Sequence, residues 1–123
     1  MGYRLSDENT GGNVVLLPGM PALTPELGAQ IAGCSCLLVD GTCWSDDELV
    51  RFGLAAKTSR QMGHLPIGGP DGSLAQLPEL GAQRTILVHL NNTNPILLAD
   101  SPQRRLVEQA GTEVAVDGLE IEV

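Results

Sequence analysis

Short apolar runs alternate with polar, glycine-rich and proline-rich segments along this chain. The run Cys36–Val39 predicts a buried strand, because short apolar runs bounded by turn residues are typical of strands covered on both faces. Arg84–His89 predicts another strand. Two further runs, Gly2–Leu5 and Asn13–Leu17, stand on either side of the turn-forming residues Asn9–Gly12. This arrangement predicts a β-hairpin near the start of the chain.

Helix-start signals, in which Ser or Thr precedes a proline or an acidic cluster, occur at three places. They predict helices that begin after Thr24, Ser45 and Ser101 and end by Gly33, Arg51 and Gly111. The segment Ser45–Glu48 has the form of a capping box, in which the two end side chains satisfy free N–H groups at a helix start. Leu74–Leu80 predicts another short helix, which Pro78 interrupts.

The longest stretch without a helical or strand period is Gly53–Gly72, and its many glycines predict a functional loop or lid. Near the end of the chain, Glu113–Val116 and Leu119–Val123 flank an Asp-Gly turn and predict a final pair of strands. Because strands and helices alternate without a linker or a repeat, we expect an α/β layered architecture in a single domain over residues 1–123.

The composition fits one small domain with an aliphatic core. The chain has 123 residues, of which 42% are hydrophobic but only 2% aromatic, so Leu, Val, Ile and Ala must fill the interior. The formal net charge of −8 argues against binding to nucleic acid or to anionic membranes, which requires a basic surface. Three cysteines without a signal peptide predict reduced thiols and a cytoplasmic protein. No apolar run reaches the roughly 20 residues of a membrane-spanning helix.

The run HLNNTNP, which begins at His89, carries the strongest chemical signal in the sequence. It follows the apolar residues Thr85–Val88, so an imidazole stands where a strand leaves the sheet. Ligands commonly bind at this end of the strands in α/β proteins. Histidine binds metals through one ring nitrogen while a neighbour holds the other, so His89 is a candidate metal ligand. The alternative is a structural histidine that is hydrogen-bonded to its own loop.

The polar residues that follow His89 offer many hydrogen-bond donors and acceptors on one turn. They are Asn91, Asn92, Thr93 and Asn94. We expect them to hold the His89 ring in one tautomer and to shape the loop. Direct contact with a cofactor or with a polar, amino-acid-like substrate is the alternative.

Two further polar residues stand where a ligand could be met. Asp40 directly follows the strand Cys36–Val39, so it is either a carboxylate of a site or part of an Asp-Gly turn. His64 lies in a segment rich in Gly and Pro, where it is either a general base or substrate contact, or an exposed loop histidine.

Two motif-like patterns indicate structure better than chemistry. Gly68–Ser73 resembles an anion-binding loop, but it lacks the lysine and the preceding strand of a P-loop, so a turn with a helix N-cap at Ser73 explains it. Cys34, Cys36 and Cys43 are poorly spaced for a tetrahedral zinc site, and we expect them to be buried apolar thiols. A catalytic pair of Cys43 with either histidine has no supporting motif.

Four segments in a fixed order carry a family likeness: DGTCW, GHLPIGGPDGS, VHLNNTNPILLADSP and EVAVDGLEI. Together they resemble the C-terminal part of the pyrroloquinoline quinone (PQQ) biosynthesis protein B family. The resemblance implies a metallo-β-lactamase-like fold, which is an αββα sandwich. This chain would form its C-terminal half, as a mixed sheet with flanking helices.

The resemblance also implies a chemistry. The family is understood as a metal-dependent hydroxylase that acts on the tyrosine ring of a crosslinked Glu-Tyr intermediate, and it has also been described as a PQQ transport-associated factor. It implies iron(II) or zinc as the cofactor and a PQQ precursor as the partner. It makes His89 a metal ligand, and it makes Asp40 and His64 catalytic residues that shape the pocket.

The chain departs from the family in length and in its ligand set. A full member is more than twice as long, and its N-terminal half carries an Asp-His ligand motif and a cysteine-rich zinc region with no counterpart here. The sequence therefore looks like a truncated protein or half of a split one. Because most metal sites need three or four protein ligands, we expect the isolated chain to be no active hydroxylase.

Two other functions fit the same sequence. One is a non-catalytic interaction module that forms a homodimer through its exposed strands near Gly2–Leu17. The other is a hydrolase of the broader metallo-β-lactamase superfamily, which would need the same additional ligands.

Overall fold

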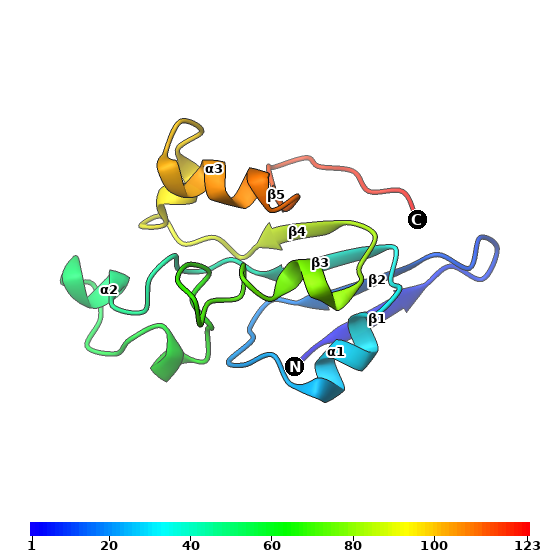
Figure 1. Ribbon diagram of the computed structural model, residues 1–123, viewed down its shortest axis with the longest axis horizontal. Coiled ribbons are helices and arrows are strands. Elements are labelled where there is room, and N and C mark those ends of the chain that lie inside the picture. Colours follow the sequence, from blue (N-terminus) through cyan, green and yellow to red (C-terminus); the bar gives the residue numbers. More distant parts are fainter.

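A five-stranded sheet forms the centre of the computed structural model, which describes residues 1–123 (Figure 1). Its strands are β1 (Tyr3–Ser6), β2 (Asn13–Leu17), β3 (Cys36–Asp40), β4 (Thr85–Val88) and β5 (Glu113–Val114), and they lie side by side in this order. β1 and β2 are antiparallel, whereas every pair from β2 to β5 is parallel. The predicted mixed α/β sheet is therefore confirmed, and the carboxyl ends of β2, β3 and β4 meet at one edge.

Short helices connect these strands. The α-helices are α1 (Pro25–Ile31), α2 (Glu48–Arg51) and α3 (Pro102–Gln109), and the 3₁₀ turns are η1 (Arg60–Met62), η2 (Leu77–Leu80) and η3 (Pro95–Leu97). The predicted starts at Thr24 and Ser101 are confirmed, because each side-chain oxygen accepts a backbone N–H from the first turn of its helix. Both helices have proline in the first turn, where no N–H partner is needed.

Two predicted N-caps are wrong. Asp47, and not Ser45, precedes α2, and it makes no side-chain cap. Glu48 does not complete a capping box, because its buried carboxylate accepts the N–H of Trp44 instead. Ser73 caps no helix either, since its hydroxyl is buried without a hydrogen-bond partner and η2 begins only at Leu77.

Of the predicted final pair of strands, only the start of the first is confirmed, and the predicted hairpin is wrong. β5 is only two residues long and pairs in parallel with β4, which α3 makes possible by carrying the chain back across the sheet. Gly118 then turns the chain with a φ of +82°, and residues 119–123 form no strand. The tail ends against the first hairpin, where the carbonyl of Val123 accepts a hydrogen bond from the Thr10 hydroxyl.

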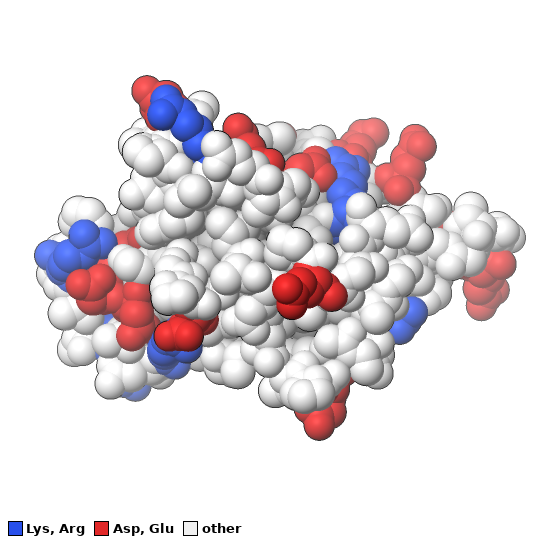
Figure 2. Space-filling view, viewed as in Figure 1, with Lys and Arg blue, Asp and Glu red and all other residues white.

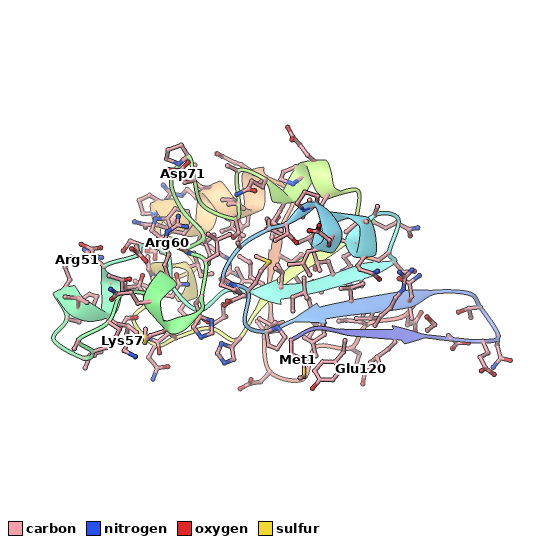
Figure 3. The ribbon with its side chains drawn as sticks, turned by 90° about the horizontal axis from the view of Figure 1, so that it is seen from below. Met1, Arg51, Lys57, Arg60, Asp71 and Glu120 are labelled. Carbon is pink, nitrogen blue, oxygen red and sulfur yellow. The ribbon has the colours of Figure 1, made fainter.

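The two faces of the sheet differ in what covers them. On one face, Val15, Leu37, Val39 and Leu87 pack in the same cluster as apolar residues of α1, α3 and the loop at 65–67. Figure 3 shows α1 and α3 on this side of the sheet and the ends of the chain, near Met1 and Glu120, on the other. The opposite face, here called the open face, carries six apolar side chains that are exposed or only half-buried: Tyr3, Leu5, Val14, Leu16, Leu38 and Val88.

Candidate metal centre

Asp40, His64 and His89 converge at the carboxyl edge of the parallel strands. One ligand-type atom of each lies within 4.8 Å of the other two. Asp40 is the last residue of β3, His89 directly follows β4, and His64 comes from the loop after η1. Asp40 is buried, His64 is half-buried and His89 is exposed, so the cluster opens outward from its carboxylate.

Asp40 is the anchor of this cluster because four hydrogen bonds fix its carboxylate. Oδ1 accepts the backbone N–H and the hydroxyl of Thr42 at 3.0 and 2.6 Å. Oδ2 accepts the backbone N–H of Met20 at 2.9 Å and faces Nδ1 of His64 at 2.7 Å. A carboxylate offers about four lone-pair sites, so these contacts occupy its capacity and hold it rigidly.

His64 is held by the core and not by a mobile lid. Its neighbours Leu65 and Ile67 belong to the hydrophobic core, and the N–H of Leu65 donates to the carbonyl of Met20 at 2.7 Å. The hydroxyl of Ser59, which is 1% exposed, donates to the carbonyl of His64 at 2.7 Å. The lid alternative for Gly53–Gly72 does not fit, because part of this loop packs into the protein and presents its imidazole to Asp40. The other alternative, a functional loop, stays a prediction.

His89 has a φ of +58°, the one positive φ at a non-glycine residue. An L-residue pays about 1–2 kcal/mol in this left-handed region, so the surrounding structure must enforce it. Nearby backbone is fixed by the N–H of Asn91, which donates to the carbonyl of Thr42 at 3.1 Å. The sharp turn directs the ring toward Thr42, whose Oγ1 lies 2.8 Å from Nδ1 of His89.

The two imidazoles lie face to face beside one hydroxyl. Their centroids are 5.2 Å apart and their planes differ by 21°. Thr42 Oγ1 is 2.8 Å from Nδ1 of His89 and 3.2 Å from Nδ1 of His64. Thr42 thus touches both rings as well as Asp40, which sequence reasoning missed; its position two residues after Asp40 was the available signal.

The asparagines after His89 take different places from those predicted. Asn94 is 2% exposed, donates to the carbonyl of Gly41 at 2.9 Å and accepts the N–H of Ile96, so it joins two loops and caps η3. Asn91 donates to the hydroxyl of Thr93, which donates in turn to the buried carboxylate of Glu48. None of these side chains is bonded to the His89 ring, so the structure assigns the contact with its Nδ1 to Thr42.

Gly41 lets the loops after β3 and β4 approach each other. A Cβ at this position would lie 2.8 Å from Leu90 Cδ2 and 3.0 Å from the carbonyl oxygen of Val88. A larger residue would therefore separate Asp40 and Thr42 from His89.

A cleft of about 520 Å³ adjoins His89 on its open side. Its wall is mainly apolar, and it includes Val88, Leu90, Leu97 and Val116. Its polar members besides His89 are Asn92 and Asp117. Asn92 is thus the one predicted asparagine that faces a space large enough for a small organic molecule.

The three cysteines are not part of the candidate metal centre. All three are free thiols with at most 1% of their surface exposed, which confirms the prediction of buried thiols. Burial raises the pKa of the Cys43 thiol to about 11, and it raises the pKa of Cys34 and Cys36 as well. Such thiols are poor nucleophiles and poor metal ligands near neutral pH.

Comparison with known proteins identifies the family. Residues 1–90 match the family model described as a beta-lactamase superfamily domain. This chain belongs to the beta-lactamase superfamily. Within the superfamily, it is 47% identical over 123 residues to coenzyme PQQ synthesis protein B of Pseudomonas putida (strain W619) and 48% identical over 120 residues to that of Azoarcus sp. (strain BH72). The resemblance to the PQQ biosynthesis protein B family is thereby confirmed.

The match covers only part of these relatives. It spans 100% and 97% of this chain but 41% and 40% of the two relatives. A solved structure described as Zn(2+)-bound PqqB from Methylobacterium extorquens superposes with a TM-score of 0.88 and 42% identity, over 93% of this chain and 41% of that one. A diphosphatase of the PhnP family gives a TM-score of 0.55 at 18% identity, over 91% of this chain and 36% of that one, which shows a shared fold alone.

Proposed function

We propose that this chain serves PQQ biosynthesis and that Asp40, His64 and His89 form its share of a metal centre. The observation that carries the proposal is the convergence of these three side chains at the sheet edge, in a chain that is 47% identical over its whole length to a PQQ synthesis protein. Ligand sites of open α/β sheets lie at this edge.

The donor set fits a divalent transition metal. The His89 imidazole suits zinc or iron(II), and the similar protein from Methylobacterium extorquens is described as Zn(2+)-bound. His89 would hold the ion because its ring is the most exposed of the three, with His64 and Asp40 beside it. A metal here would supply Lewis acidity and, if it is iron(II), open positions for dioxygen and substrate.

His64 and Asp40 have the geometry of a proton-transfer pair. Nδ1 of His64 lies 2.7 Å from a buried carboxylate oxygen, which orients the ring. Nε2 of such a ring can accept a proton from a substrate. In the finer form of the proposal, the substrate is a Glu-Tyr derived intermediate whose tyrosine ring lies in the apolar cleft beside His89 and becomes hydroxylated.

The proposal includes a limit on the isolated chain. It supplies two imidazoles and one fully hydrogen-bonded carboxylate, and it spans 41% of its relatives' length. We therefore expect weak metal binding and no hydroxylation by these 123 residues alone.

The test is the effect of His89 on PQQ production in cells that make this chain. Deleting its gene should abolish PQQ measured by mass spectrometry, and the unchanged gene should restore it. The variant His89→Ala should not restore it, whereas Phe52→Ala, which changes a 60%-exposed side chain outside the site, should. Normal PQQ levels after deletion would refute the role.

The open face favours a second candidate, a non-catalytic interaction module. Two of its six apolar side chains, Tyr3 and Leu5, lie on the exposed edge strand β1, and the other four are half-buried on β2, β3 and β4. Surfaces of this kind associate with another protein or with a second copy. Size-exclusion chromatography combined with metal analysis separates the two functions: a metal-free dimer favours the module, and a bound metal ion favours the metal centre.

A further inference from the structure

Thr42 lies at the point where the carboxylate and both imidazoles of the candidate centre meet. Its hydroxyl oxygen is 2.6 Å from Asp40 Oδ1, 2.8 Å from His89 Nδ1 and 3.2 Å from His64 Nδ1. Its side chain is largely buried, with 8% of the residue exposed, so these contacts are not shared with bulk solvent. A single hydroxyl carries one proton, so it donates to one of these neighbours and can only accept hydrogen bonds from the other two.

The proton of Thr42 must point to Asp40. An ionised carboxylate only accepts hydrogen bonds, and 2.6 Å is too short for two acceptors without a proton between them. Toward the histidines, the Thr42 oxygen can therefore only accept. Nδ1 of His89 must then carry a hydrogen, because it has no other way to bond to this oxygen at 2.8 Å.

Nδ1 of His64 must also carry a hydrogen, because it contacts Asp40 directly. Its Nδ1 lies 2.7 Å from Oδ2, so it too must donate to a carboxylate. With hydrogens on both Nδ1 atoms, the neutral rings keep their lone pairs on Nε2. We propose that Thr42 is a positioning residue that transmits the charge of Asp40 to His89 and commits its Nε2 to ligand binding. The ligand-binding role of Nε2 rests on the proposed function, but the two ring tautomers do not depend on a metal.

The test is the ring tautomer, observed by long-range ¹H–¹⁵N NMR on the metal-free 123-residue chain at about pH 8.5, above the ordinary pKa of histidine. The chain contains only two histidines, and a His64→Asn variant assigns the two signals. We expect both rings to show a protonated Nδ1 and a bare Nε2. In Thr42→Val, His89 should become a mixture of tautomers, whereas His64 should stay as it was because Asp40 still holds it.

Three controls keep this test sharp. Thr42→Ser should retain the wild-type tautomer, and Thr85→Val, which removes a buried hydroxyl from β4 away from the rings, should change nothing. Circular dichroism identifies a variant that fails to fold, and the wild-type and serine spectra then still decide. A bare Nδ1 on His89 in the wild type, or an unchanged tautomer in folded Thr42→Val, would overturn the inference.

Zinc titration separates this inference from the metal centre itself. Loss of a residue that orients a metal-binding histidine typically weakens binding about 10- to 100-fold, so Thr42→Val should show a weakening of this size. If the tautomers are as expected but the wild-type chain binds no zinc at all, the metal centre fails and the role of Thr42 in fixing the ring stands. If zinc binds but the tautomers differ from those expected, the metal centre stands and the proposed role of Thr42 fails.

Discussion

At the scale of single residues, His89 combines a strained backbone with an exposed imidazole. Its φ of +58° is a conformation that glycine adopts freely and other residues adopt at a cost. Histidine at this position lowers the stability of the fold, but the same turn places its ring beside Thr42. This is the expected pattern for a functional residue, because strain persists only where the surrounding structure enforces it.

Replacing His89 by Gly or by Ala separates the backbone cost from the side-chain loss. Both variants lose the contact with Thr42. Only alanine is strained at this positive φ, because glycine has no Cβ and adopts it freely. We expect His89→Gly to be more stable than His89→Ala by about 1 kcal/mol in urea unfolding, while neither binds metal. Equal stability of the two variants would show that the φ of this residue is not strained.

The thiol of Cys43 predicts a dependence of stability on alkaline pH. Its pKa is raised from 9.0 to about 11 by burial, so between these values the unfolded chain loses this proton while the folded chain keeps it. Stability from this group is therefore complete below about pH 9 and declines as the pH rises toward about 11. A raised pKa of this size corresponds to about 2–3 kcal/mol.

The measurement is urea unfolding of the wild type and of Cys43→Ala, in reductant, across this range of pH. The difference between the two should shift in favour of the alanine variant as the pH rises. Other groups also titrate here, but they are common to both proteins. A constant difference would contradict the assignment of a raised pKa to Cys43.

At the scale of elements, two buried serines make opposite contributions. The Ser101 hydroxyl accepts the N–H of Arg104 at 3.1 Å and donates to the carbonyl of Pro95 at 2.7 Å, so it caps α3 and ties it to η3. The Ser73 hydroxyl is buried without a partner. The same substitution therefore has different expected results at the two positions.

Ser101→Ala should lower the free energy of unfolding by about 1–2 kcal/mol, because it removes a helix cap. Ser73→Ala should leave it unchanged or raise it by up to about 1 kcal/mol, because an unsatisfied hydroxyl is removed from the interior. Urea unfolding of both variants checks this. Similar losses at both positions would mean that Ser73 has a hydrogen-bond partner in solution.

At the scale of the whole molecule, the uneven covering of the sheet is the main feature. Helices cover one face, and the open face retains apolar side chains at its surface. In the view of Figure 2, acidic and basic groups are scattered over the surface, most of them toward its periphery, with wide neutral areas between them. No helix has both the length and the apolar character needed to cross a bilayer.

The apolar open face predicts that two copies of the chain associate more strongly as the salt concentration rises. The net charge of −8 repels two copies, so added salt should strengthen apolar contact between open faces. We expect size-exclusion chromatography or analytical ultracentrifugation to show more dimer at high salt and less in Leu16→Lys. Phe52→Lys adds the same charge at an exposed residue next to α2 and should leave the dimer intact. Loss of the dimer in both variants would indicate charge alone and not the open face.

The sequence by itself determined most of the secondary structure and the residues of the candidate site. Apolar runs, proline and cap residues are local signals, so β2, β3, β4, α1 and α3 followed from them. His89, Asp40 and His64 stood out because they lie at strand ends or in a Gly- and Pro-rich loop, and the fold brings all three together.

Only the tertiary structure decided the partners of these groups. Thr42 touches both rings, whereas Asn94, which was expected near His89, instead holds a loop. Glu48 had the spacing of a capping box, but its carboxylate accepts the N–H of Trp44. Leu119–Val123 had the pattern of a strand, but β5 pairs only with β4 and the tail ends against the first hairpin at Thr10. Hydrogen bonds between residues far apart in the chain are set by how strands and loops pack, and a one-dimensional pattern does not contain that information.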